Sequence, residues 1–207
     1  MLVDILAGLL IIFFCVQHSF LASNRAKSII PVKQQYYRLF YNFIGGFTLI
    51  ILTVILVVFA SSPDNIVMKP LIYNVVNKDL STQLNILATI FEVIGIIFVA
   101  GSVIQTNPFK FAGLLAEEPD KDLQTGFFYK FARHPMYTGA ILWLGPNIFL
   151  SGNMVWFLQN LIFVAYFIIG SIFEERRLRQ ILPGYDIMFT RGSLFPWKKE
   201  HFVTLFK

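Results

Sequence analysis

The segment YNFIGGFTLIILTVILVVFA, residues 41–60, decides the fold class of this chain, because it contains no charged side chain over 20 positions. As a helix it would be about 30 Å long, which matches the hydrocarbon core of a bilayer. Four further apolar stretches occur at residues 2–20, 84–104, 137–150 and 155–173. We therefore expect an all-α integral membrane protein with about five transmembrane helices.

Composition excludes the other broad classes of protein. Of the 207 residues, 56% are hydrophobic and 14% are charged, whereas an ordinary soluble domain has roughly 25% charged residues. A disordered chain would combine low hydrophobicity with high charge, and a disulfide scaffold needs more than the single Cys15. Residues 2–20 lack a basic leader and carry Asp4, so we expect this stretch to be a membrane anchor and not a signal peptide.

The distribution of basic residues predicts the orientation of the chain. Of its 17 Lys and Arg residues, 15 lie in the first and third connections or after the fifth apolar stretch, and only Lys69 and Lys78 lie elsewhere. The positive-inside rule then places the N-terminus outside and the C-terminus in the cytoplasm. The net charge of +5 is explained by this topology and by anionic lipid headgroups. We expect the bilayer as a partner, and no nucleic acid.

The chain reads as a single membrane domain, residues 1–207, because no linker or low-complexity tract divides it. Residues 1–104 supply three N-terminal transmembrane helices. Residues 125–197 contain the fourth and fifth helices, and the short sequence Ser-Gly-Asn at 151–153 joins these two in a tight hairpin. Both outer ends of the hairpin are thus expected on the cytoplasmic side.

The first polar cluster is RHPMYTG, residues 133–139, at the start of the fourth apolar stretch. Proline suits the first turn of a helix, so Pro135 predicts a helix start with His134 near the N-cap. The free N–H groups of that turn, together with Arg133, would favour a bound carboxylate or phosphate. The alternative is an arginine that reaches to the membrane surface beside an ordinary helix cap.

The second polar cluster is EERRL, residues 174–178, at the end of the fifth apolar stretch. Two adjacent carboxylates at a membrane boundary are unfavourable unless a cation meets them. Local pairs are the alternative explanation, in which Glu174 reaches Arg177 and Glu175 reaches Arg179. The helix is expected to end before Pro183, with the chain folding back toward the membrane through Tyr185 and Phe189.

Together the two clusters bring an anion-binding helix start, two carboxylates and several aromatic rings to one face. S-adenosylmethionine has matching groups, because it carries a carboxylate, cationic groups, hydroxyls and an aromatic base. The motifs RHPMYTG (133–139) and EERRL (174–178), with Phe-Pro-Trp at 195–197, resemble the isoprenylcysteine carboxyl methyltransferase family. In the N-terminal half, QHS (17–19) and YRLFYN (37–42) resemble the branch of methanethiol S-methyltransferases and NnrU-like proteins.

This resemblance implies a multi-pass enzyme of a bacterial inner membrane or an endomembrane. It would transfer a methyl group from S-adenosylmethionine to a small thiol, a prenylcysteine carboxylate or a lipid-like acceptor. The segment after the fifth helix departs from the family pattern, because it reads LPGY at 182–185 and then Phe189. The catalytic residues implied are Arg133, His134 and Glu175, and the cofactor-binding residues are Arg133, His134, Pro135, Tyr137, Glu174, Glu175 and Tyr185.

Two other functions are consistent with parts of the sequence. A sterol-reductase-like enzyme would use NADPH, although no phosphate-binding glycine loop supports it. A non-catalytic accessory protein or transporter would account for Glu92, which lies inside an apolar stretch and is either functional or hydrogen-bonded between helices. The histidines, His18, His134 and His201, are scattered without the spacing of metal ligands, so no metal site is expected.

Overall fold

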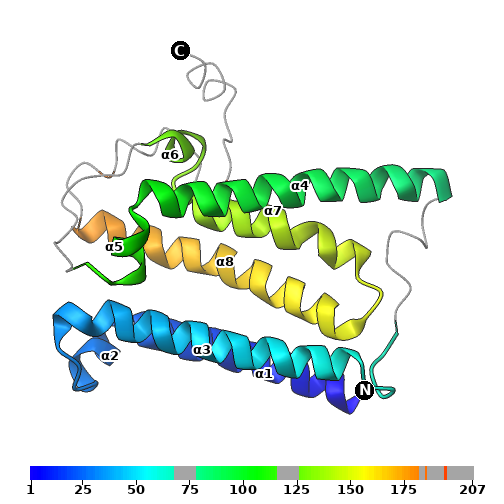
Figure 1. Cartoon of the computed structure of the whole chain (residues 1–207), viewed down its shortest axis with the longest axis horizontal. Coiled ribbons are helices and arrows are strands. Elements are labelled where there is room, and N and C mark those ends of the chain that lie inside the picture. Colours follow the sequence, from blue (N-terminus) through cyan, green and yellow to red (C-terminus); the bar gives the residue numbers. More distant parts are fainter. Residues whose placement is uncertain (68–77, 116–125, 182–184, 186–193, 195–207) are drawn as a thin grey trace.

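The computed structural model of the chain describes residues 1–67, 78–115, 126–181, 185 and 194, and its regular elements in these ranges are all helices (Figure 1). An isolated bridge between Val67 and Asn153 is added to them. The helices are α1 (Leu2–Ala22), α2 (Asn24–Ile29), α3 (Gln34–Ala60), α4 (Lys78–Gln105), α5 (Pro108–Ala112), α6 (Phe127–Phe131), α7 (Pro135–Leu150) and α8 (Met154–Ile181).

Each of the five expected apolar stretches lies in a long helix. Four of these helices, α1, α3, α4 and α8, are long and apolar enough to cross a membrane. The fourth stretch forms α7, which has 16 residues with Pro146 inside it and measures only about 24 Å. The protein is therefore a multi-pass integral membrane protein, with four candidate membrane-spanning helices in the described part of the chain.

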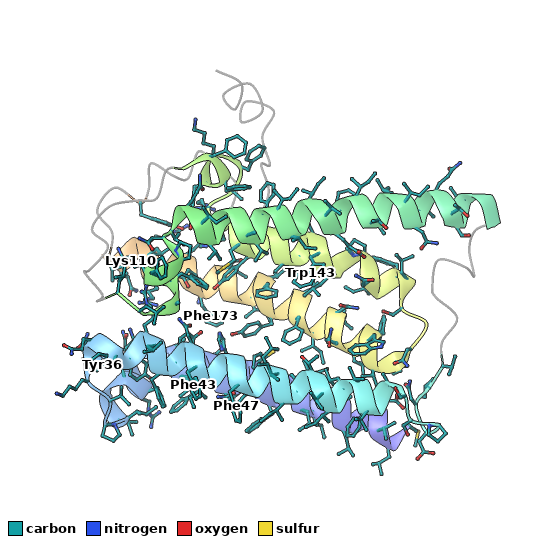
Figure 2. All side chains as sticks on the ribbon, in the orientation of Figure 1. Tyr36, Phe43, Phe47, Lys110, Trp143 and Phe173 are labelled. Atoms are coloured by element: carbon teal, nitrogen blue, oxygen red, sulfur yellow. The ribbon has the colours of Figure 1, made fainter. Side chains whose placement is uncertain are left out.

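Helix α8 lies in the middle of the bundle, between α7 and α4 on one side and α1 and α3 on the other (Figure 1). The outer faces of the helices are apolar. Phe43 and Phe47 on α3, for example, are 67% and 54% exposed and point away from the bundle (Figure 2), as lipid-facing side chains do. The core between α1, α3 and α8 consists of Ala7, Ile11, Phe14, Cys15, Leu52, Leu56 and Val155.

Helices α4 and α7 pack backbone to backbone through two glycines. A Cβ atom on Gly95 would lie 2.5 Å from the carbonyl oxygen of Gly139, and one on Gly139 would lie 2.6 Å from the carbonyl oxygen of Gly95. Small residues allow such close approach of helices in a membrane. Between the same helices, Asn147 Nδ2 donates a hydrogen bond to Glu92 Oε1 at 2.9 Å. Glu92 therefore has the interhelical hydrogen bond that was one of its two expected roles.

The end of the bundle that holds Met1 is joined by polar contacts between distant segments. Ile66 N donates to Asp4 Oδ1 at 3.3 Å, and Met154 N donates to Ile66 O at 3.0 Å. Asn153 Nδ2 in the turn between α7 and α8 donates to Ala60 O at 3.0 Å. These bonds join the ends of α1 and α3 to the turn of the hairpin, and so fix the position of the N-terminal helices relative to α7 and α8.

Candidate functional site

The start of α7 forms the first wall of the site. His134 occupies the N-cap position and Pro135, fully buried, is the first helical residue, as the sequence predicted. Thr138 anchors this turn, because its backbone N–H and its hydroxyl both donate to the carbonyl of His134, at 2.9 and 3.1 Å. The same hydroxyl donates to the carbonyl of Leu194. The start of α7 is thereby tied to a residue beyond the end of α8.

Glu175 on α8 is the centre of a buried polar network. Its Oε1 lies 2.9 Å from Arg133 Nη2 and 3.5 Å from His134 Nε2. The side chains of Arg133, His134 and Glu175 are only 10%, 7% and 13% exposed. The other carboxylate oxygen lies 3.9 Å from Arg179 Nη2, which is 49% exposed, so this expected local pair is present but weakly stabilising. The hairpin thus brings the two sequence clusters together.

His134 is a neutral imidazole at pH 7. Burial lowers its pKa from the ordinary 6.5 to about 4, and Arg133 acts in the same direction. The Glu175 carboxylate opposes this shift without cancelling it. The His134 side chain makes no hydrogen bond to the first turn of α7. The ring is therefore available to interact with Glu175, and to exchange a proton, and does not cap the helix.

Two aromatic residues border this network. The ring of Tyr137 stacks on His134 with centroids 5.6 Å apart and contacts Phe167 on α8 at 5.7 Å. Tyr185 is 3% exposed, and burial together with the Glu175 charge raises its pKa to about 12. Tyr185 is therefore within electrostatic range of Glu175 and remains a neutral phenol. Phe189 lies outside the described residues.

Glu174 faces a different side of α8 from Glu175. Its charge acts on the phenol groups of Tyr137, Tyr185 and Tyr41 of α3. Within the described ranges no side chain hydrogen-bonds to Glu174 or forms an ion pair with it, and the expected pair with Arg177 is not formed. All seven predicted site residues thus lie at the end of the hairpin opposite the turn between α7 and α8, but the two glutamates have different surroundings.

A polar cluster from the N-terminal half lies beside the hairpin, and the sequence gave these residues no role in the site. The hydroxyl of Tyr41 on α3 and His18 Nε2 on α1 are hydrogen-bonded, and Ser19 Oγ lies 3.0 Å from the hydroxyl of Tyr166 on α8. Both contacts join residues of different helices. His18 therefore takes part in a hydrogen bond between α1 and α3.

A basic pocket of about 190 Å³ opens between α3, α4 and α7. Ligand pockets usually measure about 300–1,000 Å³, so this one is too small for a whole nucleoside. Lys110, at the same end of the molecule as the end of α8 (Figure 2), contributes a backbone carbonyl that accepts from Arg38 Nη1 at 3.2 Å. The lining residues are Arg38, Ser102, Thr106, Lys110, Phe111, Tyr129 and Met136.

The chain matches a known protein family over nearly all of its length. The sequence model of the family described as NnrU protein matches residues 5–193. The chain belongs to the NnrU family. This NnrU-family match spans the hairpin, both polar clusters and the N-terminal helices, and the family is related to membrane methyltransferases. Searches of the curated proteins and of the solved structures each found no match.

Proposed function

We propose that this NnrU-family protein is an S-adenosylmethionine-dependent membrane methyltransferase. The observation that carries the proposal is the buried network of Arg133, His134 and Glu175, which is formed from both arms of the hairpin. Charged side chains with this degree of burial at a membrane protein's end are typical of functional sites. Because the family is related to membrane methyltransferases, methyl transfer is the reaction that we propose for this network.

Each group in the cluster matches a group of S-adenosylmethionine. Arg133 is suited to the carboxylate, because a guanidinium binds carboxylates with two parallel hydrogen bonds. The first N–H groups of α7 favour the same negative charge. Glu175 is suited to a hydroxyl or the ammonium group, and Tyr137 and Tyr185 offer rings to the adenine or the sulfonium. Pro135 holds the start of α7, and with it Arg133 and His134, in position.

The reaction would be a direct in-line displacement without a covalent enzyme intermediate. When bound, S-adenosylmethionine supplies a methyl group on a positively charged sulfur. The residues of the site would align the acceptor with that methyl group and exclude water. Both effects accelerate the attack of an anionic acceptor on a cationic donor. A protic acceptor could give its proton to His134, which is neutral at pH 7. Acceptors that reach the site from the bilayer include small thiols, prenylcysteine carboxylates and lipid-like amines.

Calorimetry with the detergent-purified protein tests the proposal. We expect S-adenosylmethionine to bind with micromolar affinity, and Arg133→Ala and Glu175→Ala to lose at least tenfold in affinity, which is about 1.4 kcal/mol. The variants' circular dichroism and thermal unfolding show whether they are folded. A well-folded wild type without binding would overturn the proposal. Tight binding of NADPH instead would favour the reductase.

A further inference from the structure

The basic pocket lies where two membrane helices leave the hydrocarbon core. Its wall includes Arg38 of α3 and, at the end of α4, Ser102 and Thr106. The apolar part of α3 begins at residue 41 and that of α4 ends at residue 104, so Arg38 and Thr106 lie only about 3–5 Å beyond these limits. The headgroup layer of a bilayer extends about 5–8 Å beyond the hydrocarbon on each side. The pocket is therefore level with the phosphates of the lipids.

The residues next to Lys110 are suited to contact with lipid. Phe109, Phe111, Leu114 and Leu115 are all exposed, and Lys110, which lines the pocket, stands between the two phenylalanines. A cationic side chain flanked by exposed apolar side chains is typical of a segment in the membrane interface. A molecule that occupies the pocket can therefore come from the lipid layer.

Three contacts fix the position of α5 against α3. Arg38 Nη1 donates to the carbonyl of Lys110 at 3.2 Å, and Asn42 Nδ2 donates to the carbonyl of Phe111 at 2.8 Å. Gly113 has a φ of 81° and packs so closely that a Cβ atom on it would collide with the backbone of α3. The backbone segments that carry Arg38 and Lys110 are thus held together before any ligand binds.

The polar groups of the pocket suit an anion that also carries a hydrogen-bond donor. Arg38 and Lys110 supply positive charge, and no carboxylate is among the described residues that line the pocket. Ser102 and Thr106 already donate their hydroxyl protons to backbone carbonyls of α4, so their oxygens can only accept a further hydrogen bond. A ligand with a phosphate and a hydroxyl satisfies both kinds of group. The volume of about 190 Å³ admits a small headgroup and no larger ligand.

We propose that this pocket binds a phosphate group, and that an anionic phospholipid such as phosphatidylglycerol supplies it. Arg38 and Lys110 hold the phosphate, and Ser102 and Thr106 accept from a hydroxyl of the headgroup. Phosphatidylcholine presents the same phosphate, but its quaternary ammonium has no donor and would lie beside two cations. The depth of the pocket favours a lipid over a soluble phosphate ester as the source. The inference does not rest on the proposed function.

The first test measures lipid binding to the full chain in detergent, by native mass spectrometry and by the melting temperature. A ligand that binds only the folded protein raises its melting temperature. We expect phosphatidylglycerol to bind saturably and to raise the melting temperature, and phosphatidylcholine to bind at least tenfold more weakly. Glycerol phosphate, the soluble headgroup, should also bind at least tenfold more weakly. Equal binding of the two lipids would overturn the inference, and equal binding of glycerol phosphate would assign the pocket to a soluble ester instead.

A second pair of lipids isolates the role of the two hydroxyl oxygens. Phosphatidylmethanol has the same net charge as phosphatidylglycerol, but its headgroup has no hydroxyl to donate to Ser102 and Thr106. It should bind about three- to tenfold more weakly, which is the usual effect of one lost hydrogen bond. Equal affinities for these two anionic lipids would contradict the part assigned to the hydroxyls.

Lys110→Gln and Lys33→Gln are the matched variants. Lys110→Gln removes one charge from the pocket and leaves the backbone carbonyl that accepts from Arg38, so the fold is kept. It should weaken phosphatidylglycerol about tenfold, and Arg38→Gln should do the same. Lys33 is exposed just before α3 and does not line the pocket, so Lys33→Gln should leave the affinity within about twofold. Equal losses in Lys110→Gln and Lys33→Gln would mean general attraction of charge, and would overturn the inference.

Failure of this inference differs in appearance from failure of the proposed function. Arg38 and Lys110 lie outside the network of Arg133, His134 and Glu175, so their variants should bind S-adenosylmethionine as the wild type does. A folded wild type that shows no preference for phosphatidylglycerol excludes the lipid site, whether or not it binds S-adenosylmethionine.

Discussion

At the level of single residues, His134 connects the stability of the site to pH. Its pKa in the folded protein is about 4 and its ordinary value is 6.5, so between these values the unfolded chain takes up a proton that the folded chain does not. The free energy of unfolding therefore falls as pH falls through this window. We expect the melting temperature of the wild type to fall from pH 6.5 to 4.5.

The variant His134→Gln isolates this effect, because glutamine keeps a polar group and has no proton to gain in this range. Its melting temperature should depend less steeply on pH than that of the wild type. The two proteins have the same carboxylates, so these contribute equally to both curves. Parallel curves for the two proteins between pH 6.5 and 4.5 would mean that folding does not lower the pKa of His134. The same variant separates the chemical roles, since an unchanged pH–rate profile would argue against His134 as the base.

At the level of helices, the contact between α4 and α7 depends on glycine. Gly139→Ala would place a methyl group 2.6 Å from the carbonyl oxygen of Gly95 and 2.8 Å from Val99 N, and neither atom can move without a shift of the helix. We expect a loss of about 1–3 kcal/mol in stability, measured as a lower melting temperature. Gly145→Ala on the same helix is the control, because nothing lies within 4 Å of its added methyl group. Equal effects of the two changes would refute the close packing.

The helices were predictable where they cross lipid and less so at their ends. Hydropathy detects only the apolar part of a span. It predicted α3 over residues 41–60, whereas the helix begins at Gln34. The helical backbone hydrogen bonds continue beyond the apolar residues into the membrane interface, where polar side chains are no longer unfavourable. For the same reason α8 continues past residue 173 to Ile181. Residues 182–184, where the sequence predicts the end of this helix, lie outside the described residues.

The candidate site was predictable on the hairpin for a related reason. Pro135 fixes a helix start and the Ser-Gly-Asn turn returns the chain, so short-range signals alone bring Arg133 and Glu175 to the same end. The contacts of α1 and α3 with this site depend on how whole helices pack. The pair of His18 and Tyr41 joins helices through side chains 23 residues apart, and lipid-facing and helix-facing positions of both are equally apolar. Sequence periodicity therefore carried little information about them.

For the whole molecule, the two ends of the bundle differ in charge, and this predicts which side of the membrane the site faces. Helices α2 and α5 and the end of α8 lie at one end, and Met1 and the turn between α7 and α8 lie at the other (Figure 1). The positive-inside rule then predicts that the basic residues described at the first of these ends face the cytoplasm. The network around Glu175 belongs to this end and would receive a cofactor from the cytosol.

Two serines provide matched positions for testing this orientation. Ser28 in α2 and Ser61 after α3 are both exposed, and each hydroxyl donates to a backbone carbonyl of its own helix, at 2.8 and 2.9 Å. A membrane-impermeant maleimide added to intact cells should label Ser61→Cys, and should label Ser28→Cys only after lysis. The wild type controls for Cys15, which is 7% exposed and should not react. The reverse pattern would place Arg133 and Glu175 outside the cell, where cytosolic S-adenosylmethionine does not reach them, and would exclude the proposed methyltransferase even if the isolated protein bound the cofactor.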